Sequence, residues 1–173
     1  MTKTELAKQM RVVSYLTGEF VLRSGNISNF YWDKYRFESN PTLLTAIAEE
    51  MAKLLPSECD GLAGLELGGI PLATALSLQT GLPCFYVRKE AKTYGTCNLI
   101  EGGVKQGSTL VVIEDVITTA GQVCTSIEQI RAEGYTVEHV VAAIDRQAGG
   151  AAKINASGCS FASVFTLAEL EGE

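Results

Sequence analysis

The sequence predicts an α/β fold in which a parallel β-sheet is flanked by helices, with a small N-terminal hood. Three observations predict it. Apolar, strand-like segments alternate with helical ones from residue 61 onward, each apolar segment ends in a glycine-rich or polar turn, and aromatic, β-favouring residues precede this pattern. Strands that alternate with helices pair in parallel, and ligands bind beyond their carboxyl ends. The 173 residues suit one domain, residues 1–173, to which residues 1–39 contribute a helix and the hood.

Capping and turn signals predict the N-terminal elements. Thr2 and Glu5 have the spacing of a capping box, and apolar residues at helical spacing follow, so we expect a helix that ends by Gly18. From residue 20 to residue 35, β-favouring residues are interrupted by the Ser-Gly-Asn turn at 24–26. This pattern predicts two short strands and a turn, which would form the hood.

The main sheet is predicted from the rest of the chain. Asn40 can cap a helix that has Pro41 at its first position and that ends before Pro56. The segments that follow are a strand at 61–65, a helix to about residue 80, a strand at 83–87, a strand at 109–114, a helix at about 121–133 and a strand at 137–144.

Composition limits the possible functions. Hydrophobic residues make up 46% of the chain, yet no apolar stretch is long enough to span a membrane and no cleavable signal precedes the first helix, so we expect a soluble, cytoplasmic protein. A net charge of −6 argues against nucleic acid as a partner. The five cysteines are scattered without a Cys-x-x-Cys pair, which favours reduced thiols. His139, the single histidine, lies in an apolar strand pattern and is expected to be structural.

The most informative segment spans residues 111–123 and reads Val-Val-Ile-Glu-Asp-Val-Ile-Thr-Thr-Ala-Gly-Gln-Val. It predicts a strand that leads into an acidic, hydroxyl-rich loop at the start of a helix, where backbone N–H groups can hold a phosphate. Glu114 and Asp115 can accept hydrogen bonds from ribose hydroxyls beside that phosphate. The simpler alternative is a strand that ends in two solvated acids and a polar helix cap. Because neither glycine-rich nucleotide motif is present, the segment indicates a phosphoribosyl binder.

A long irregular stretch lies between residues 88 and 108. It contains four glycines and the cations Arg88, Lys89, Lys92 and Lys105. This length exceeds an ordinary connection, and most of the cations follow directly after a predicted strand. We therefore expect a mobile functional loop, although a surface hairpin would also fit the pattern.

Several segments together resemble the orotate phosphoribosyltransferases of the type I phosphoribosyltransferase family. The resemblance covers most of residues 18–150 in the expected order. Its parts are the phosphoribosyl-diphosphate signature at 114–122, the N-terminal segment at 20–33, the pyrophosphate-facing loop at 64–73, the mobile catalytic loop at 88–102 and the orotate-binding element Asp145-Arg146.

The resemblance implies that orotate N1 displaces pyrophosphate from C1 of phosphoribosyl diphosphate, giving orotidine 5′-phosphate in the synthesis of UMP. It also implies Mg²⁺, held mainly through the substrate with no direct protein ligand, and a homodimer whose loop 88–105 reaches the neighbouring site. The chemistry of this reaction agrees with the presence of cations in the loop, because negative charge builds on the leaving pyrophosphate and requires cations there. A closing loop would also exclude water from the activated sugar.

The same resemblance implies the site residues. Catalytic roles would belong to Lys89, Lys92 and Asp115. Orotate would be bound by Thr118 and Arg146, with Tyr31 and Trp32 either as a wall near the base or as core packing. Phosphoribosyl diphosphate would be bound by Arg23, Gly68, Arg88, Lys89, Lys92, Tyr94, Glu114, Asp115, Val116, Ile117, Thr118, Thr119, Ala120, Gly121 and Gln122.

Four positions depart from the family pattern. Arg23 replaces a common lysine, which keeps the charge but changes donor geometry. Tyr94 stands where many relatives have histidine, so a cation near neutral pH is lost. Gly68 replaces a lysine that some members carry, which leaves more of the binding to backbone N–H groups. Ala120 replaces a frequent glycine, and we expect this change to be mild because the amide remains.

Two other functions stay open. A transferase of the same architecture could act on a purine or another base, but Arg146 favours a base with a carboxylate, such as orotate. A sensor could bind phosphoribosyl diphosphate and regulate a partner without turnover. The acidic charge disfavours a nucleic-acid regulator, and the loop cations favour an enzyme.

Overall fold

A computed structural model of the chain describes residues 1–21, 25–92, 95 and 97–172. Its centre is a six-stranded sheet in the order β5-β4-β3-β6-β7-β8, and all neighbouring pairs are parallel except β4 with β5. The predicted α/β fold with a parallel sheet is therefore confirmed. The strands are β3 (Gly61–Leu65), β4 (Cys84–Val87), β5 (Ile100–Glu101), β6 (Thr109–Ile117), β7 (Thr136–Asp145) and β8 (Ser160–Thr166).

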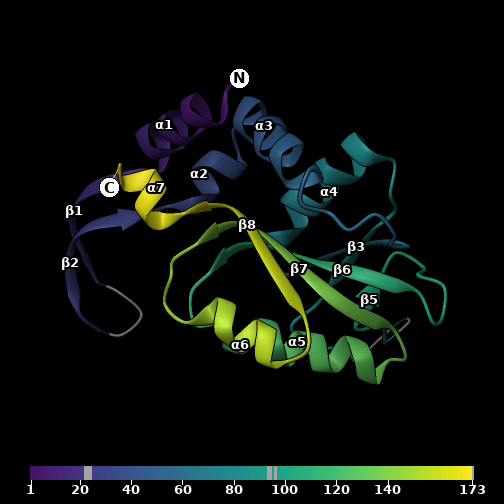
Figure 1. Cartoon of the computed structure of the whole chain (residues 1–173). Coiled ribbons are helices and arrows are strands. Elements are labelled where there is room, and N and C mark those ends of the chain that lie inside the picture. Colours follow the sequence, from purple (N-terminus) through teal and green to yellow (C-terminus); the bar gives the residue numbers. More distant parts are fainter. Residues whose placement is uncertain (22–24, 93–94, 96, 173) are drawn as a thin grey trace.

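Helices cover both faces of this sheet (Figure 1). On one face lie α5 (Gly121–Ala132) and α6 (Gly150–Ala156). The other face carries α1 (Lys3–Ser14), α2 (Lys34–Glu38), α3 (Pro41–Ala52), α4 (Gly69–Thr80) and α7 (Leu167–Glu171). Within the described residues, none of these helices has both the length and the apolar character needed to cross a lipid bilayer.

The alternation of side chains along β6 divides the core into two halves. Val111 and Ile113 pack with the residues of α1, α3 and α4, whereas Leu110 and Val112 pack with those of α5. This follows from strand geometry, in which successive side chains point to opposite faces. The same alternation decides where the two acids that follow in β6 can point.

The hood is an antiparallel hairpin of β1 (Tyr15–Val21) and β2 (Ile27–Trp32). Its strands are held in part by stacking of Tyr15 on Phe30, with ring centroids 5.3 Å apart. The sequence prediction was wrong about the boundary before it: α1 ends at Ser14 rather than near Gly18, because residues 15–21 pair with β2. Helix α2 was also missed; it includes Tyr35, which was assigned to a strand.

The prediction for α3 is confirmed. Asn40 caps this helix, its side chain accepts hydrogen bonds from Thr42 N and Leu43 N, and α3 ends at Ala52, before Pro56. The irregular stretch after Val87 contains β5, whose Ile100 pairs with Val87. All five cysteines are free.

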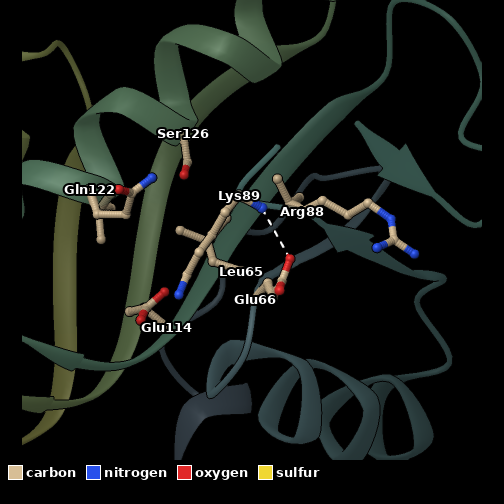
Figure 2. A pocket seen from close by; sticks show the side chains of 9 residues that line it. Leu65, Glu66, Arg88, Lys89, Glu114, Gln122 and Ser126 are labelled. Atoms are coloured by element: carbon tan, nitrogen blue, oxygen red, sulfur yellow. Dashed lines mark hydrogen bonds between the residues drawn. The ribbon is translucent and has the colours of Figure 1, made fainter. Parts of the chain in front are cut away.

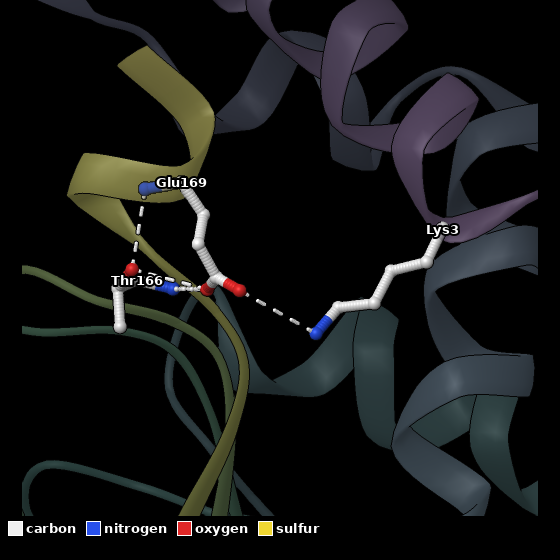
Figure 3. Close-up of polar contacts among 3 residues, drawn as sticks. All are labelled: Lys3, Thr166 and Glu169. Carbon is white, nitrogen blue, oxygen red and sulfur yellow. Dashed lines mark hydrogen bonds and ion pairs between the residues drawn. The ribbon is translucent and has the colours of Figure 1, made fainter. Parts of the chain in front are cut away.

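The C-terminal elements α6, β8 and α7 were not predicted. Thr166 and Glu169 form a capping box at the start of α7, which repeats the box at Thr2 and Glu5 at the start of α1. Glu169 also lies 3.8 Å from Lys3 Nζ, so this contact joins the two ends of the chain (Figure 3). The pair is half-exposed and contributes roughly 0–1 kcal/mol, whereas Leu170 of α7 is buried and its carbonyl accepts a hydrogen bond from Arg11 of α1.

Candidate active site

The carboxyl ends of the parallel strands gather the loops of the candidate site. Glu66 N, after β3, donates a hydrogen bond to Val87 O at the end of β4, at 2.9 Å. Arg146 N, after β7, donates to Ile117 O at the end of β6, also at 2.9 Å. The three segments predicted to bind substrate, 64–73, 114–122 and 145–146, therefore meet at one edge of the sheet.

Strand β6 continues to Ile117, three residues beyond its predicted end. Asp115 consequently lies within the strand, as Glu114 does, and not in a loop after it. Because strand side chains alternate, Glu114 is on the face that carries α5 and Asp115 is on the face that carries α2 and α4. Their surroundings agree: Glu114 lines a pocket with Gln122, whereas Asp115 contacts Lys34.

Glu114 belongs to a pocket between β3, β4 and the first turns of α5 (Figure 2). The side chain of Lys89 points toward Glu114, and Lys89 N donates a hydrogen bond to Glu66 Oε2 at 3.1 Å. Burial, reinforced by the neighbouring Asp115 charge, raises the pKa of Glu114 well above its ordinary value. The residues that line the pocket are Leu65, Glu66, Val87, Arg88, Lys89, Glu114, Gln122, Val123 and Ser126.

Asp115 is fully buried on the opposite face. Its Oδ1 accepts a hydrogen bond from Val116 N at 2.5 Å, and its Oδ2 forms an ion pair with Lys34 Nζ from α2. Gly68 lies so close that a Cβ added to it would overlap Asp115 Oδ2. Position 68 is therefore restricted to glycine by Asp115, and the loop before α4 is packed onto this carboxylate.

Glu38, one turn after Lys34 on α2, is 5% exposed. Neither of its carboxyl oxygens has a well-formed hydrogen bond within the described residues. Burial and the Asp115 charge, opposed by Lys34, raise the pKa of Glu38 to about 8. Burial lowers the pKa of Lys34, but the adjacent Asp115 carboxylate outweighs burial and raises it overall. Helix α2, which follows the hood hairpin, thus brings the cation Lys34 and the acid Glu38 to the buried side of the site.

The predicted phosphate loop has the geometry of an anion site. Ala120 adopts a left-handed conformation (φ 55°) directly before α5, whose first turn, like that of any α-helix, has N–H groups without intrahelical partners. Thr118 and Thr119 are exposed there, and Gly150 packs against Thr118 O, where a Cβ would overlap it.

The expectation that Ala120 is a mild change, because its amide remains, stays a prediction, but the structure adds a conformational cost. The left-handed region costs a non-glycine residue about 1–2 kcal/mol, so alanine is strained here and glycine would not be.

The loop cations are paired within the loop. Arg88 Nε lies 3.0 Å from Glu101 Oε1, and Lys92 Nζ forms an ion pair with the same oxygen. Lys92 and then Arg88 lower the pKa of Glu101. Of the loop residues assigned to the leaving group, Lys89 is directed at the pocket acid, while Arg88 and Lys92 are held on β5.

The remaining predicted residues lie at different distances from this centre. Arg146 is exposed directly after β7. In the hood, Tyr31 is exposed and packs on Phe20, whereas Trp32 is half-buried against the main core and meets Tyr15 edge-on. Arg23 and Tyr94 lie outside the described residues. His139 Nδ1 lies 2.5 Å from Ser160 Oγ, in keeping with a structural role.

Sequence reasoning missed Lys34, Glu38 and Lys153. A Cβ on Gly121 would lie 3.6 Å from Lys153 Nζ, which places this ammonium from α6 beside the start of α5. The spacing of Lys34 and Glu38, four residues apart and directly after the aromatic segment, was a usable signal for a helix face. Nothing in the sequence relates Lys153 to the phosphate loop, because α6 follows after a separate strand.

A divalent cation at this pocket would need oxygen ligands. Glu66 and Glu114 offer carboxylate oxygens at the pocket, and these are ligands that Mg²⁺ prefers. Among the described residues, however, no group of three or more His, Cys, Asp or Glu side chains is arranged to hold a metal ion. Glu66 and Glu114 could therefore each offer a carboxylate ligand to a Mg²⁺ ion at this pocket.

Comparison with known proteins agrees with this geometry. The family model of the phosphoribosyl transferase domain matches residues 36–161. An orotate phosphoribosyltransferase of Nocardioides sp. is 49% identical over 96% of this chain and 93% of its own length. A second, from Methanocella arvoryzae, is 41% identical over 97% of this chain and 95% of its own length.

Solved structures give the same result. An orotate phosphoribosyltransferase of Mycobacterium tuberculosis superposes with a TM-score of 0.88 at 33% identity, covering 97% of this chain and 98% of that chain. The same enzyme in complex with 5-phospho-α-D-ribosyl 1-diphosphate gives a TM-score of 0.84 at 31% identity, with 98% of both chains covered. With family model, sequence relatives and structures in agreement, the chain belongs to the phosphoribosyltransferase family and, within it, to the orotate phosphoribosyltransferases.

Proposed function

We propose that this protein transfers the phosphoribosyl group of 5-phosphoribosyl 1-diphosphate to orotate, giving orotidine 5′-phosphate and diphosphate for UMP synthesis. The observation that carries the proposal is the course of residues 114–122: two acids at the end of β6, then a left-handed turn into the N-terminus of α5. This arrangement offers carboxylates to a sugar and N–H groups to its 5′-phosphate within one short segment.

The choice of orotate rests on Arg146. It is exposed directly after β7, and its backbone is hydrogen-bonded to the end of β6, so its guanidinium starts beside the phosphoribosyl segment. A guanidinium binds a carboxylate with two parallel hydrogen bonds, and orotate carries a carboxylate that purines lack. Thr118, at the start of the phosphate loop, is a second contact for the base in this proposal.

The pocket residues divide the work of the transfer. Glu114 accepts hydrogen bonds from the ribose hydroxyls. Asp115 accepts them once its Oδ2 is no longer paired with Lys34. Residues Thr118 to Gln122 hold the 5′-phosphate. Lys89 reaches the pocket from the end of β4, so it can meet the negative charge that builds on the departing diphosphate. Mg²⁺ bound to the diphosphate would add charge neutralisation at the leaving group.

Arg88 and Lys92 complete the cation set only after they leave Glu101. Their ion pairs with that residue keep them on β5, so their assigned role requires the loop after β4 to rearrange around the substrate. Lys92 is proposed as the catalytic cation. Lys92→Ala should therefore lower turnover far more than it lowers the melting temperature, and unchanged turnover would remove Lys92 from the site.

Two further properties belong to the proposal. The enzyme acts as a homodimer in which loop 88–105 reaches the neighbouring site, and it works in the cytoplasm. Mixed dimers of a Lys92→Ala chain and an Asp115→Ala chain test the exchange, because one of the two sites would then combine an intact loop with an intact Asp115. Verified mixed dimers without any recovered activity would contradict the exchange of loops.

One assay tests the function itself. The purified protein is mixed with Mg²⁺ and phosphoribosyl diphosphate, and orotate, adenine, hypoxanthine or uracil is added in parallel while base consumption and diphosphate release are followed. Turnover with orotate alone supports the proposal. Turnover with another base alone would indicate the same chemistry on a different acceptor. Binding of phosphoribosyl diphosphate without turnover of any base would favour a regulatory protein.

A further inference from the structure

Among the described residues, Lys34 forms an ion pair with Asp115, an acid of the proposed sugar-binding segment. It is the first residue of α2, its side chain is 32% exposed, and its ammonium is paired with the fully buried Oδ2 of Asp115. The other oxygen of Asp115 is already bonded to Val116 N at 2.5 Å. In this arrangement Lys34 is the donor at the oxygen of Asp115 that a ribose hydroxyl would need.

The surroundings do not allow Asp115 to serve both partners by turning. Gly68 lies against Oδ2, where even a Cβ would overlap, and the bond from Val116 N fixes Oδ1. Lys34, in contrast, is partly exposed on a flexible four-carbon stem. Of the two partners, the lysine is the one that can move.

The local charge gives a reason for such a movement. Glu38 and Glu114 interact electrostatically with this centre, but burial raises the pKa of both, so Asp115 is the acid that the Lys34 ammonium pairs with. A diphosphate that enters beside these acids needs cations close by, and Arg88 and Lys92 are engaged by Glu101. An ammonium released at Gly68, on the loop between β3 and α4, would lie where the diphosphate side of the substrate is expected.

We propose that Lys34 is a further substrate-binding residue: the ribose hydroxyls replace its ammonium at Asp115, and the released ammonium then pairs with the diphosphate. The inference rests on the proposed function, since it assumes a phosphoribosyl diphosphate at this edge of the sheet. The exchange does not leave Oδ2 of Asp115 without a partner, because a hydroxyl donor takes the place of the ion-paired ammonium. It also moves one positive charge from the enzyme's own acid to the substrate.

The exchange predicts opposite effects on the two halves of the substrate. In a Lys34→Met variant, the affinity for pyrophosphate in the presence of Mg²⁺ should fall about tenfold or more, as expected for loss of a charge-assisted contact. The affinity for ribose 5-phosphate should stay equal or increase, because no ammonium competes for Asp115. Lys34→Arg should retain most of the affinity for pyrophosphate. Titration calorimetry measures the affinity for each ligand. The matched control is Lys53→Met, which removes an exposed lysine that is paired with Glu50 of α3.

A purely structural lysine gives a different result. In that case Lys34→Met would lower the affinity for both pyrophosphate and ribose 5-phosphate, and it would also lower the melting temperature. This outcome would overturn the proposal. An unchanged affinity for pyrophosphate would overturn it as well.

A measurement on the unaltered protein avoids the risk that Lys34→Met does not fold. Lysine acetylation followed by mass spectrometry should show slow labelling of Lys34 in the free protein, faster labelling with ribose 5-phosphate, and renewed protection when pyrophosphate and Mg²⁺ are added. Labelling of Lys53 should not change. Constant labelling of Lys34 in all three conditions would refute the exchange, whereas absence of turnover with orotate in the same preparation would refute the proposed function instead.

Discussion

The Glu38→Gln substitution should remove a large part of the pH dependence of folding stability. Glu38 is buried on α2, faces Asp115, Asp33 and Glu114 as like charges, and has Lys34 as the opposing one. Its pKa is raised to about 8, from an ordinary value of 4.5. Between these two values the folded state binds more protons than the unfolded state, so the free energy of unfolding falls as pH rises.

The size of the effect follows from that window. Each pH unit between 4.5 and about 8 changes the free energy of unfolding by about 1.4 kcal/mol, which sets an upper bound of roughly 5 kcal/mol. Because Lys34 is partly exposed and can adjust to the Glu38 charge, we expect about half of this, roughly 2–3 kcal/mol. Glutamine has nearly the same shape and does not ionise, so the variant should gain stability relative to the wild type as pH rises from 5 to 8.5.

Urea unfolding at several pH values and a fixed protein concentration measures this difference. The control is Glu49→Gln, an exposed position on α3. The quantity to compare is the change in free energy of unfolding between pH 5 and pH 8.5, because Glu114 contributes a slope of the same sign to every variant. Equal slopes for the wild type and Glu38→Gln would show that Glu38 ionises freely in the folded protein and would refute the reasoning.

Three other substitutions test separate parts of the site. Gly68→Ala should lower the free energy of unfolding by about 1–3 kcal/mol because its Cβ would overlap Asp115 Oδ2, and an unchanged thermal unfolding midpoint would contradict this packing. Glu101→Gln should tighten pyrophosphate binding about two- to fivefold, because Lys92 no longer has its partner; calorimetry that shows weaker binding would mean that Glu101 positions the loop instead. Lys153→Ala should raise the Kd of ribose 5-phosphate about three- to tenfold with little change in melting temperature, and an unchanged Kd would place Lys153 outside the phosphate site.

The fold was predictable because local signals and tertiary packing agree over most of the chain. Asn40 caps α3 and the 61–65 strand has its predicted bounds, since caps and fully apolar strands depend little on distant contacts. The end of α1 was not predictable in this way. Helical spacing continues through Leu16, but pairing with β2 takes residues 15–21 into a strand, and the partner strand lies beyond the Ser-Gly-Asn turn.

The sequence predicted which segments lie together at the candidate site, but not the geometry of their side chains. The order of acids, threonines and glycine in residues 114–122 indicated a phosphoribosyl segment, and the structure brings this segment together with Gly68 and the loop after β4. The position of Lys34 could not be predicted, because its partner Asp115 lies 81 residues further along the chain and the contact depends on how α2 packs. Ala120 shows the same limit, since its left-handed conformation is a property of the folded loop.

The two adjacent acids owe their different environments to the extra length of β6. If the strand ended at Glu114, Asp115 would lie in the following loop and could turn to face the sugar together with Glu114. Because it continues to Ile117, alternation sends Glu114 to the pocket at α5 and Asp115 to the buried side at α2. One residue then meets the loop cation Lys89 and the other meets the hood cation Lys34. In the proposed complex, a sugar that draws on both carboxylates would therefore affect the contacts of Lys89 in the loop and of Lys34 on α2 at once, which would connect substrate binding to both of these segments.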